Sequence, residues 1–154
     1  MAIGRQAAAS SSYAIAIGDR AQATKAQAVA LGQSAAATGA VSQAIGANSK
    51  SIGDYSNAIG AGAVANNFKS TALGFKASAN IDSSIALGSH SVAETARDVG
   101  GYIPKTKGTG SSSDTAFYST AGALSIGDET AGYRRQITNV SAGLKTQTPS
   151  TLLS

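Results

Sequence analysis

The sequence predicts an all-β solenoid made of 14-residue coils, and a strict period is the main reason. Pairs of Ile or Leu followed by Gly begin every 14 residues through seven copies, and Ala precedes every pair. An α-helix would repeat at about 3.6, 7 or 11 residues, and a Gly in every copy would weaken it by about 1 kcal/mol. Fourteen residues instead fit one coil with two strands of about five residues and two tight turns.

The composition agrees with a repeat fold and argues against two alternatives. Ile, Leu, Val and Phe together make up 27 of 154 residues, which is few for an ordinary globular core, whereas Ala alone numbers 32. A net charge of +4 with 13% charged residues is too low for a charged disordered tail. The chain has no Cys, which excludes disulfide scaffolds and thiolate metal sites.

Each copy combines one bulky residue, one Gly and several columns of small residues. The Gly supplies either a positive φ angle or room for a close backbone approach. Ala or Ser three residues before and six residues after the bulky residue would let two strand layers lie close together. Copies two to seven are defined by Ile17, Gly18, Leu31, Gly32, Ile45, Gly46, Ile59, Gly60, Leu73, Gly74, Leu87 and Gly88.

Such a thin coil predicts self-association. One Ile or Leu and several Ala per coil bury too little apolar area to offset the entropy of ordering the coil. A second apolar column, which includes Ile15, Val29 and Ile85, also needs a partner. Packing two, three or more rods side by side would cover this column, and the period alone leaves the number open.

The elements follow in a simple order along the chain. Residues 1–97 hold the seven coils, and because Ile3-Gly4 is already in phase, we expect the chain to be part of a longer protein. Residues 98–124 interrupt the repeat, and a looser eighth copy, Ser125-Ile126-Gly127, places a last coil at residues 125–133. The sequence contains no run of 18 or more apolar residues and therefore predicts no membrane-spanning helix.

Few residues are suited to catalysis or metal binding. His90 is the only histidine, and its neighbours Ser89 and Ser91 form no triad with it, because a nucleophile and its base must converge through the fold. Asp82 and Glu94 lie in other columns of the repeat than His90. We therefore expect no enzyme activity, no catalytic residues, no metal site and no cofactor.

Three stretches of the chain together resemble one family. The pattern Ser-x-Ala-(Ile/Leu)-Gly-x-x-(Ala/Ser)-x-Ala at 14-residue spacing is similar to the head repeat of YadA-like trimeric autotransporter adhesins. The stretch RRQITNVSAG, residues 134–143, resembles the start of the neck motif in this family. Residues 98–128 are similar to an insertion often found in these heads before the last coil.

The resemblance implies a left-handed parallel β-roll whose three chains assemble as a homotrimer. It also implies an extracellular head at the cell surface of a Gram-negative bacterium, with membrane contact only through an outer-membrane anchor outside this sequence. Such a head would mediate attachment to a host, and hence virulence, or autoagglutination. The neck residues implied by the motif are Arg135, Ile137, Asn139 and Val140.

The segment after the neck motif departs from the family pattern. Residues 144–154 read LKTQTPSTLLS, where a helix start is expected, and Pro149 cannot lie in a helix interior. We interpret this segment as an atypical tail or one foreign to the native protein.

The expected partners are host matrix proteins (collagen, laminin or fibronectin) or cell-adhesion receptors of the carcinoembryonic-antigen type, and not nucleic acid. Aromatic and basic residues at the rim of a Gly/Ser-rich insertion favour a contact surface there. These candidate contacts are Tyr102, Lys105, Lys107, Phe117 and Tyr118. In the alternative interpretation the aromatic residues pack on the roll as the base of a hairpin. Two other functions stay open: a spacer rod that carries another binding domain, and a segment of a trimeric phage fibre.

Overall fold

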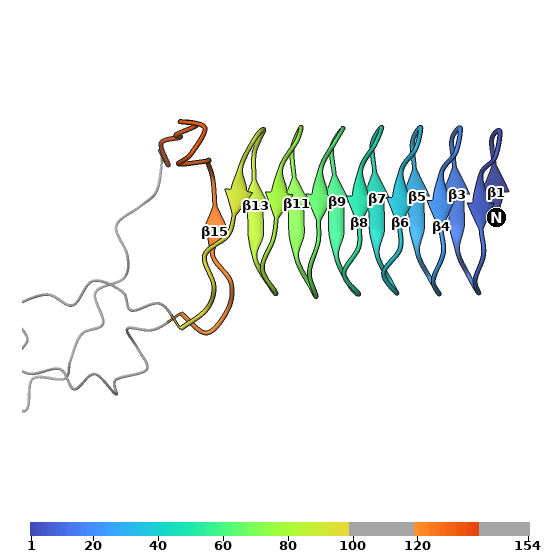
Figure 1. Ribbon diagram of the computed structural model, residues 1–154, viewed down its shortest axis with the longest axis horizontal. Helices are drawn as coiled ribbons and strands as arrows, with labels where there is room; N and C mark the ends of the chain where they lie inside the picture. The colour runs from blue at the N-terminus through green and yellow to red at the C-terminus, as the bar shows by residue number, and fades with distance from the viewer. Residues whose placement is uncertain (99–118, 139–154) are drawn as a thin grey trace, which may run out of the picture.

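A computed structural model describes residues 1–98 and 119–138, and it confirms a parallel β-solenoid of seven coils of about 14 residues (Figure 1). Each coil contributes one strand to each of two sheets. The eight-stranded sheet contains β1 (Ala2–Ile3), β3 (Ile15–Ile17), β5 (Val29–Leu31), β7 (Gln43–Ile45), β9 (Asn57–Ile59), β11 (Thr71–Leu73), β13 (Ile85–Leu87) and β15 (Leu124–Ser125). The seven-stranded sheet contains β2 (Ala8–Ala9), β4 (Gln22–Ala23), β6 (Ala36–Ala37), β8 (Lys50–Ser51), β10 (Val64–Ala65), β12 (Ser78–Ala79) and β14 (Val92–Ala93).

The strands are shorter than the five residues expected from the period. A complete coil has one strand of three residues and one of two, because the turns take the remaining positions. One turn closes by a hydrogen bond from the Ala21 N–H to the Gly18 carbonyl oxygen, at 3.2 Å. Arg20 inside this turn has a φ of 57°, and the equivalent residues of the other coils are also left-handed.

The core between the two sheets is built almost entirely from Ala and Ser. Within a strand, side chains alternate between the two faces of the sheet, so Ala16 points inward while Ile15 and Ile17 point outward. The fully buried core residues of one coil are Ala28, Ala30, Ala35 and Ala37. Because these side chains are so small, the two sheets lie close together, as the Ala columns predicted.

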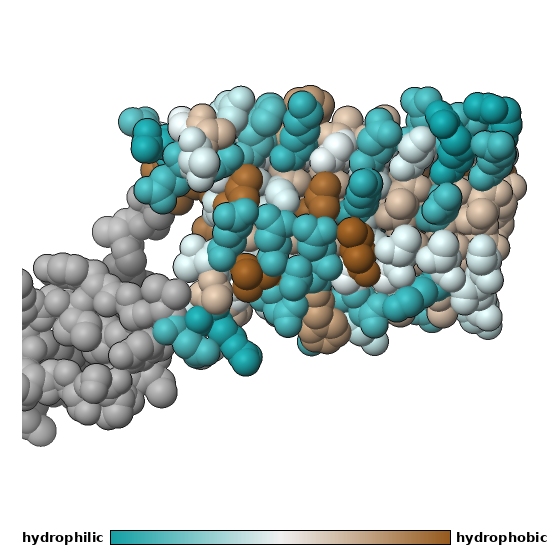
Figure 2. Space-filling view, viewed as in Figure 1, coloured by the Kyte–Doolittle hydropathy of each residue, from teal (hydrophilic) through white to brown (hydrophobic). Residues whose placement is uncertain are grey.

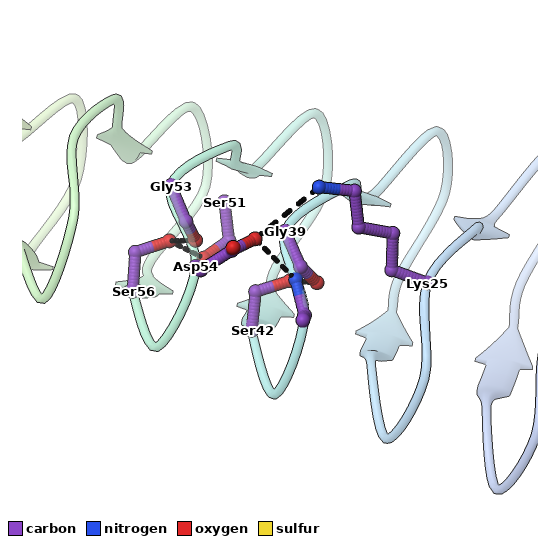
Figure 3. Close-up of polar contacts among 8 residues, drawn as sticks. Lys25, Gly39, Ser42, Ser51, Gly53, Asp54 and Ser56 are labelled. Atoms are coloured by element: carbon purple, nitrogen blue, oxygen red, sulfur yellow. Dashed lines mark hydrogen bonds and ion pairs between the residues drawn. The ribbon is translucent and has the colours of Figure 1, made fainter.

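Several coils place Ser in this core, and each buried hydroxyl has a partner. Ser42 donates to the Gly39 carbonyl oxygen at 2.7 Å, and Ser56 donates to that of Gly53 at 2.6 Å (Figure 3). The Ser51 and Ser56 hydroxyl oxygens lie 2.6 Å apart inside the roll. A satisfied hydroxyl can replace an Ala methyl group at little cost, since buried polar groups are unfavourable mainly when unpaired.

The repeated Gly has both of the roles that the sequence left open. Gly18 has a φ of 134°, and a Cβ atom on it would lie 2.5 Å from the Gly32 carbonyl oxygen of the next coil. The strands stack in exact register, with Ile17 paired to Leu31 and Leu31 to Ile45. A side chain in this column would therefore collide with the backbone of the neighbouring coil.

The end of the roll carries the looser eighth copy. In β15, Leu124 pairs with Ile85 and Ser125 pairs with Ala86 of β13, so Ser125 continues the Ala column. Most of the interrupting segment, residues 99–118, lies outside the described residues, as do residues 139–154. In the described ranges, no helix is long and apolar enough to cross a membrane.

Candidate functional site

The outer face of the eight-stranded sheet carries the bulky apolar side chains of the repeat. Leu73, Ile85 and Leu87 at its C-terminal end each expose 42% of their surface. The sequence placed a column that needs a partner at Ile15, Val29 and Ile85, and the structure adds the Ile/Leu column to the same face. Gln43, Asn57 and Thr71 interrupt the first column in the middle coils, whereas the Ile/Leu column is continuous. We call this surface the apolar face; its apolar residues are Ile15, Ile17, Val29, Leu31, Ile45, Ile59, Leu73, Ile85 and Leu87.

The outer face of the seven-stranded sheet has a different character. Its outward positions include Gln22, Ala36, Lys50, Val64 and Ser78, so polar and apolar residues alternate from coil to coil. Figure 2 shows a face of the roll on which hydrophobic residues are scattered among hydrophilic ones. A contiguous exposed apolar surface marks an interaction site, whereas scattered apolar residues do not. The two outer faces therefore differ in what they can bind.

One turn of the roll carries an exposed aromatic pair. Tyr55 and Phe68 meet edge to face, with ring centroids 5.8 Å apart. The Lys69 ammonium lies 4.9 Å from the centre of the Phe68 ring, within the range of a cation–π contact. The opposite turn repeats this pairing, since the Lys76 ammonium lies 5.2 Å from the centre of the Phe75 ring. The signal in the sequence is the dipeptide Phe-Lys, which occurs twice at a spacing of seven residues.

His90 takes part in packing. Its ring stacks on Tyr133 at 4.6 Å and meets Phe75 edge to face at 5.2 Å, while Nδ1 lies 2.8 Å from the Ser89 hydroxyl oxygen. Glu94 accepts instead from the Asn80 side chain, at 3.2 Å. Residues 1–98 and 119–138 contain no group of three His, Asp or Glu side chains that could hold a metal ion.

Polar side chains also connect neighbouring turns. Asp54 accepts a hydrogen bond from the Ala40 N–H at 2.8 Å, and the Lys25 ammonium lies 3.3 Å from the same oxygen (Figure 3). The Ala40 N–H, and secondly Lys25, lower the pKa of the Asp54 carboxyl below its usual 3.8. The turns therefore gain contacts between coils beyond those of the two sheets.

Of the predicted neck residues, Arg135 makes specific contacts with the roll. Its guanidinium donates to the Ser89 carbonyl oxygen, to the Ile126 carbonyl oxygen and, at 3.1 Å, to the Ser91 hydroxyl. No spacing or motif signals that two of the three partners of Arg135 are backbone carbonyl groups. Ile137 is 69% exposed.

The remaining predicted site residues lie outside the described part of the chain. Asn139 and Val140 of the neck motif belong to this set, so their role stays a prediction. The same holds for all five candidate ligand contacts of the insertion: Tyr102, Lys105, Lys107, Phe117 and Tyr118.

Comparison with known families agrees with the repeat geometry. The family model described as the YadA head domain repeat (2 copies) matches the chain over three ranges, residues 1–21, 23–49 and 65–91. No curated protein matches the sequence. The matched ranges contain six of the seven Ile/Leu-Gly pairs, all except Ile59-Gly60, and Arg135 contacts Ser89 and Ser91 at the end of the last matched range. The chain therefore contains a YadA-like head domain, and head domains of this kind belong to surface-exposed trimeric autotransporter adhesins.

Proposed function

We propose that this domain is a non-catalytic adhesin head that works as a homotrimer of left-handed β-rolls. The family supports the number of chains and the handedness, and the apolar face supports the association itself. That face carries a bulky Ile or Leu in every coil, above a core of Ala and Ser that buries little apolar area. Packing the apolar faces of three chains together would supply the hydrophobic burial that one roll lacks.

Attachment would then occur through the surfaces that stay outside the trimer. These are the mixed outer face of the seven-stranded sheet, the turns, and the insertion with Tyr102 and Lys105. Three identical copies allow multivalent attachment, whose avidity can exceed the affinity of one site by about 100-fold or more. The proposed partners are collagen, laminin, fibronectin or receptors of the carcinoembryonic-antigen type on the host, or other bacteria in autoagglutination.

A structural spacer is the second candidate function. The regular stack of coils in Figure 1 is a rod, and a rod can hold another binding domain at a distance. A segment of a trimeric phage fibre would share this geometry, and only the family match favours the adhesin over it. A spacer would bind no host protein, which separates it from an adhesin head.

Light scattering tests the assembly. We expect a mass three times that of the 15.1 kDa chain. Leu31→Asp introduces a charge into the apolar face and should abolish the trimer. Gln22→Asp, on the other sheet, is the matched control and should leave it intact. A folded wild-type protein with the mass of a single chain would contradict the assembly.

Binding to a panel of the host proteins, at low and high salt, tests the adhesion. We expect tight binding to one partner that survives high salt, because contacts between exposed charges alone are screened. Deletion of residues 98–124 then asks whether the insertion carries the binding. Binding to no partner, or only to acidic polymers at low salt, would favour the spacer.

A further inference from the structure

The last complete turn of the roll differs from the preceding ones in its hydrogen-bond donor. In successive coils the carbonyl group two residues after the bulky residue accepts a backbone N–H of the next coil. The Asp19 carbonyl oxygen accepts from Ser34, and that of Phe75 accepts from His90, both at 2.8 Å. Ser89 occupies the equivalent position in the seventh coil, and there the donor is the Nη2 group of Arg135.

The guanidinium also takes the space of a following coil. In earlier coils, a Cβ atom on the repeat Gly would collide with the backbone of the next coil; on Gly74 it would lie 2.5 Å from the carbonyl carbon of Gly88. On Gly88 the nearest atom to such a Cβ is Cζ of Arg135, at 3.0 Å. The Arg135 side chain thus lies against Gly88 in the place where, in every earlier copy, the backbone of the next coil lies against the repeat Gly.

The short arm that precedes Arg135 holds it in this place. The Asp128 carboxylate accepts the N–H groups of Thr130 and Ala131 at 2.9 and 3.1 Å, which closes a turn. The Asp128 N–H donates to the Tyr133 carbonyl oxygen at 2.8 Å. The Tyr133 ring stacks on His90, in the same turn of the roll that Arg135 covers.

We propose that Arg135 is an end cap of the roll, in which its guanidinium replaces the backbone donor that a further coil would bring to the Ser89 carbonyl group. Arg suits this role because its planar group carries five N–H donors in a fixed arrangement and can reach several oxygens at once. β15 already covers β13 at this end of the roll, so Arg135 covers the turn after β13. Unpaired backbone groups at an uncovered end of a parallel stack can pair with strands of other molecules. The cap therefore has two consequences: it protects the last coil from local opening, and it prevents another chain from stacking there.

Hydrogen exchange on the whole chain tests the first consequence. Arg135→Ala should speed exchange of the Val92 amide, which is bonded to the Gly127 carbonyl oxygen at 2.7 Å, by about tenfold or more. Amides of the first coils, such as Gly18, should be unchanged. Arg134→Ala is the matched control, because it removes the neighbouring guanidinium, and should have no effect. Arg135→Lys should protect only partly, since an ammonium group lacks the planar array of donors.

Two further readouts separate a cap from a general packing role. Millimolar guanidinium should restore protection in Arg135→Ala. Light scattering should show that this variant, unlike the wild type, associates beyond the wild-type mass as its concentration rises. Unchanged exchange at Val92 in Arg135→Ala would overturn the proposal. So would an equal effect of Arg134→Ala, or lost protection that guanidinium does not restore.

Discussion

Gly18 lies directly against the carbonyl group of Gly32 in the next coil, and a Cβ atom on Gly18 would come within 2.5 Å of that oxygen. The same close approach recurs between Gly32 and Gly46 and between Gly46 and Gly60. The column of Gly residues therefore lets neighbouring coils approach closely enough for their backbones to form hydrogen bonds. It also explains why this position is Gly in all seven copies, while the residue after it varies freely.

Replacing Gly18 with Ala should destabilise the roll severely. The new methyl group meets backbone that cannot move without breaking the register, and a φ of 134° is strained for any L-residue. We expect a loss of about 3 kcal/mol or more in the free energy of unfolding, measured by urea denaturation at a fixed protein concentration.

Gly62→Asn is the control for this variant. Gly62 also has a positive φ, of 67°, but a Cβ atom there would meet only the Lys76 side chain, at 3.3 Å. Asn48 occupies the same column one coil earlier, at a φ of 57°. Gly62→Asn should therefore change stability by less than about 1 kcal/mol. Equal losses in the two variants would show that the close approach of backbone is not what distinguishes Gly18 from Gly62.

Val41→Asn should stabilise the protein. Val41 has a φ of 55°, a region that costs an L-residue roughly 1–2 kcal/mol and is especially unfavourable for a β-branched side chain. Its side chain is exposed, so the substitution loses little burial. Asn tolerates this conformation, and we expect a gain of about 1 kcal/mol in a urea or thermal denaturation experiment. Gln27→Asn, in the same column, should gain less because Gln is not β-branched.

The sequence predicted the coil well because its period directly reflects the stacking register. The interval between Ile17 and Leu31 is the distance from one coil to the next, and the structure pairs these residues. The alternation within Ile15-Ala16-Ile17 equally predicts which side chains share a face. Strand lengths were harder to predict, since they depend on where residues such as Arg20 adopt a left-handed φ, and no residue type marks that column.

The candidate site was less predictable for a different physical reason. The contacts of Arg135 with Ser89 and Ser91 join positions 46 and 44 residues apart, and their acceptors include a backbone carbonyl group that every residue possesses. No composition or spacing signals such a pair. The stacking of His90 on Tyr133 is hidden in the same way, because an arm outside the regular repeat brings the rings together.

The narrow core predicts that size matters more than polarity inside the roll. Ala30 points into the core and is fully buried, whereas Ala36 points outward from the opposite sheet. Ala30→Leu would force the two sheets apart and should cost about 3 kcal/mol or more. Ala36→Leu should stay within about 0.5 kcal/mol of the wild type. Urea denaturation compares the two, and tolerance of Leu at position 30 would mean that the sheets are more loosely packed than described.

Acid should remove the contribution of Asp54 to stability. The pKa of its carboxyl is lowered below 3.8, first by the Ala40 N–H and then by Lys25, so the folded state binds its proton less readily than the unfolded state. The contribution is therefore complete above the unfolded pKa, and it is lost as the pH falls through the lower folded pKa.

The variant Asp54→Asn tests this assignment, because an Asn side chain does not titrate and its contribution to stability should not be lost in acid. We expect the difference in urea midpoint between the wild type and Asp54→Asn to be largest near about pH 6 and to shrink towards about pH 2. Lys25→Met should narrow this difference but keep its direction, because the Ala40 N–H remains; a difference that is constant with pH would refute the assignment.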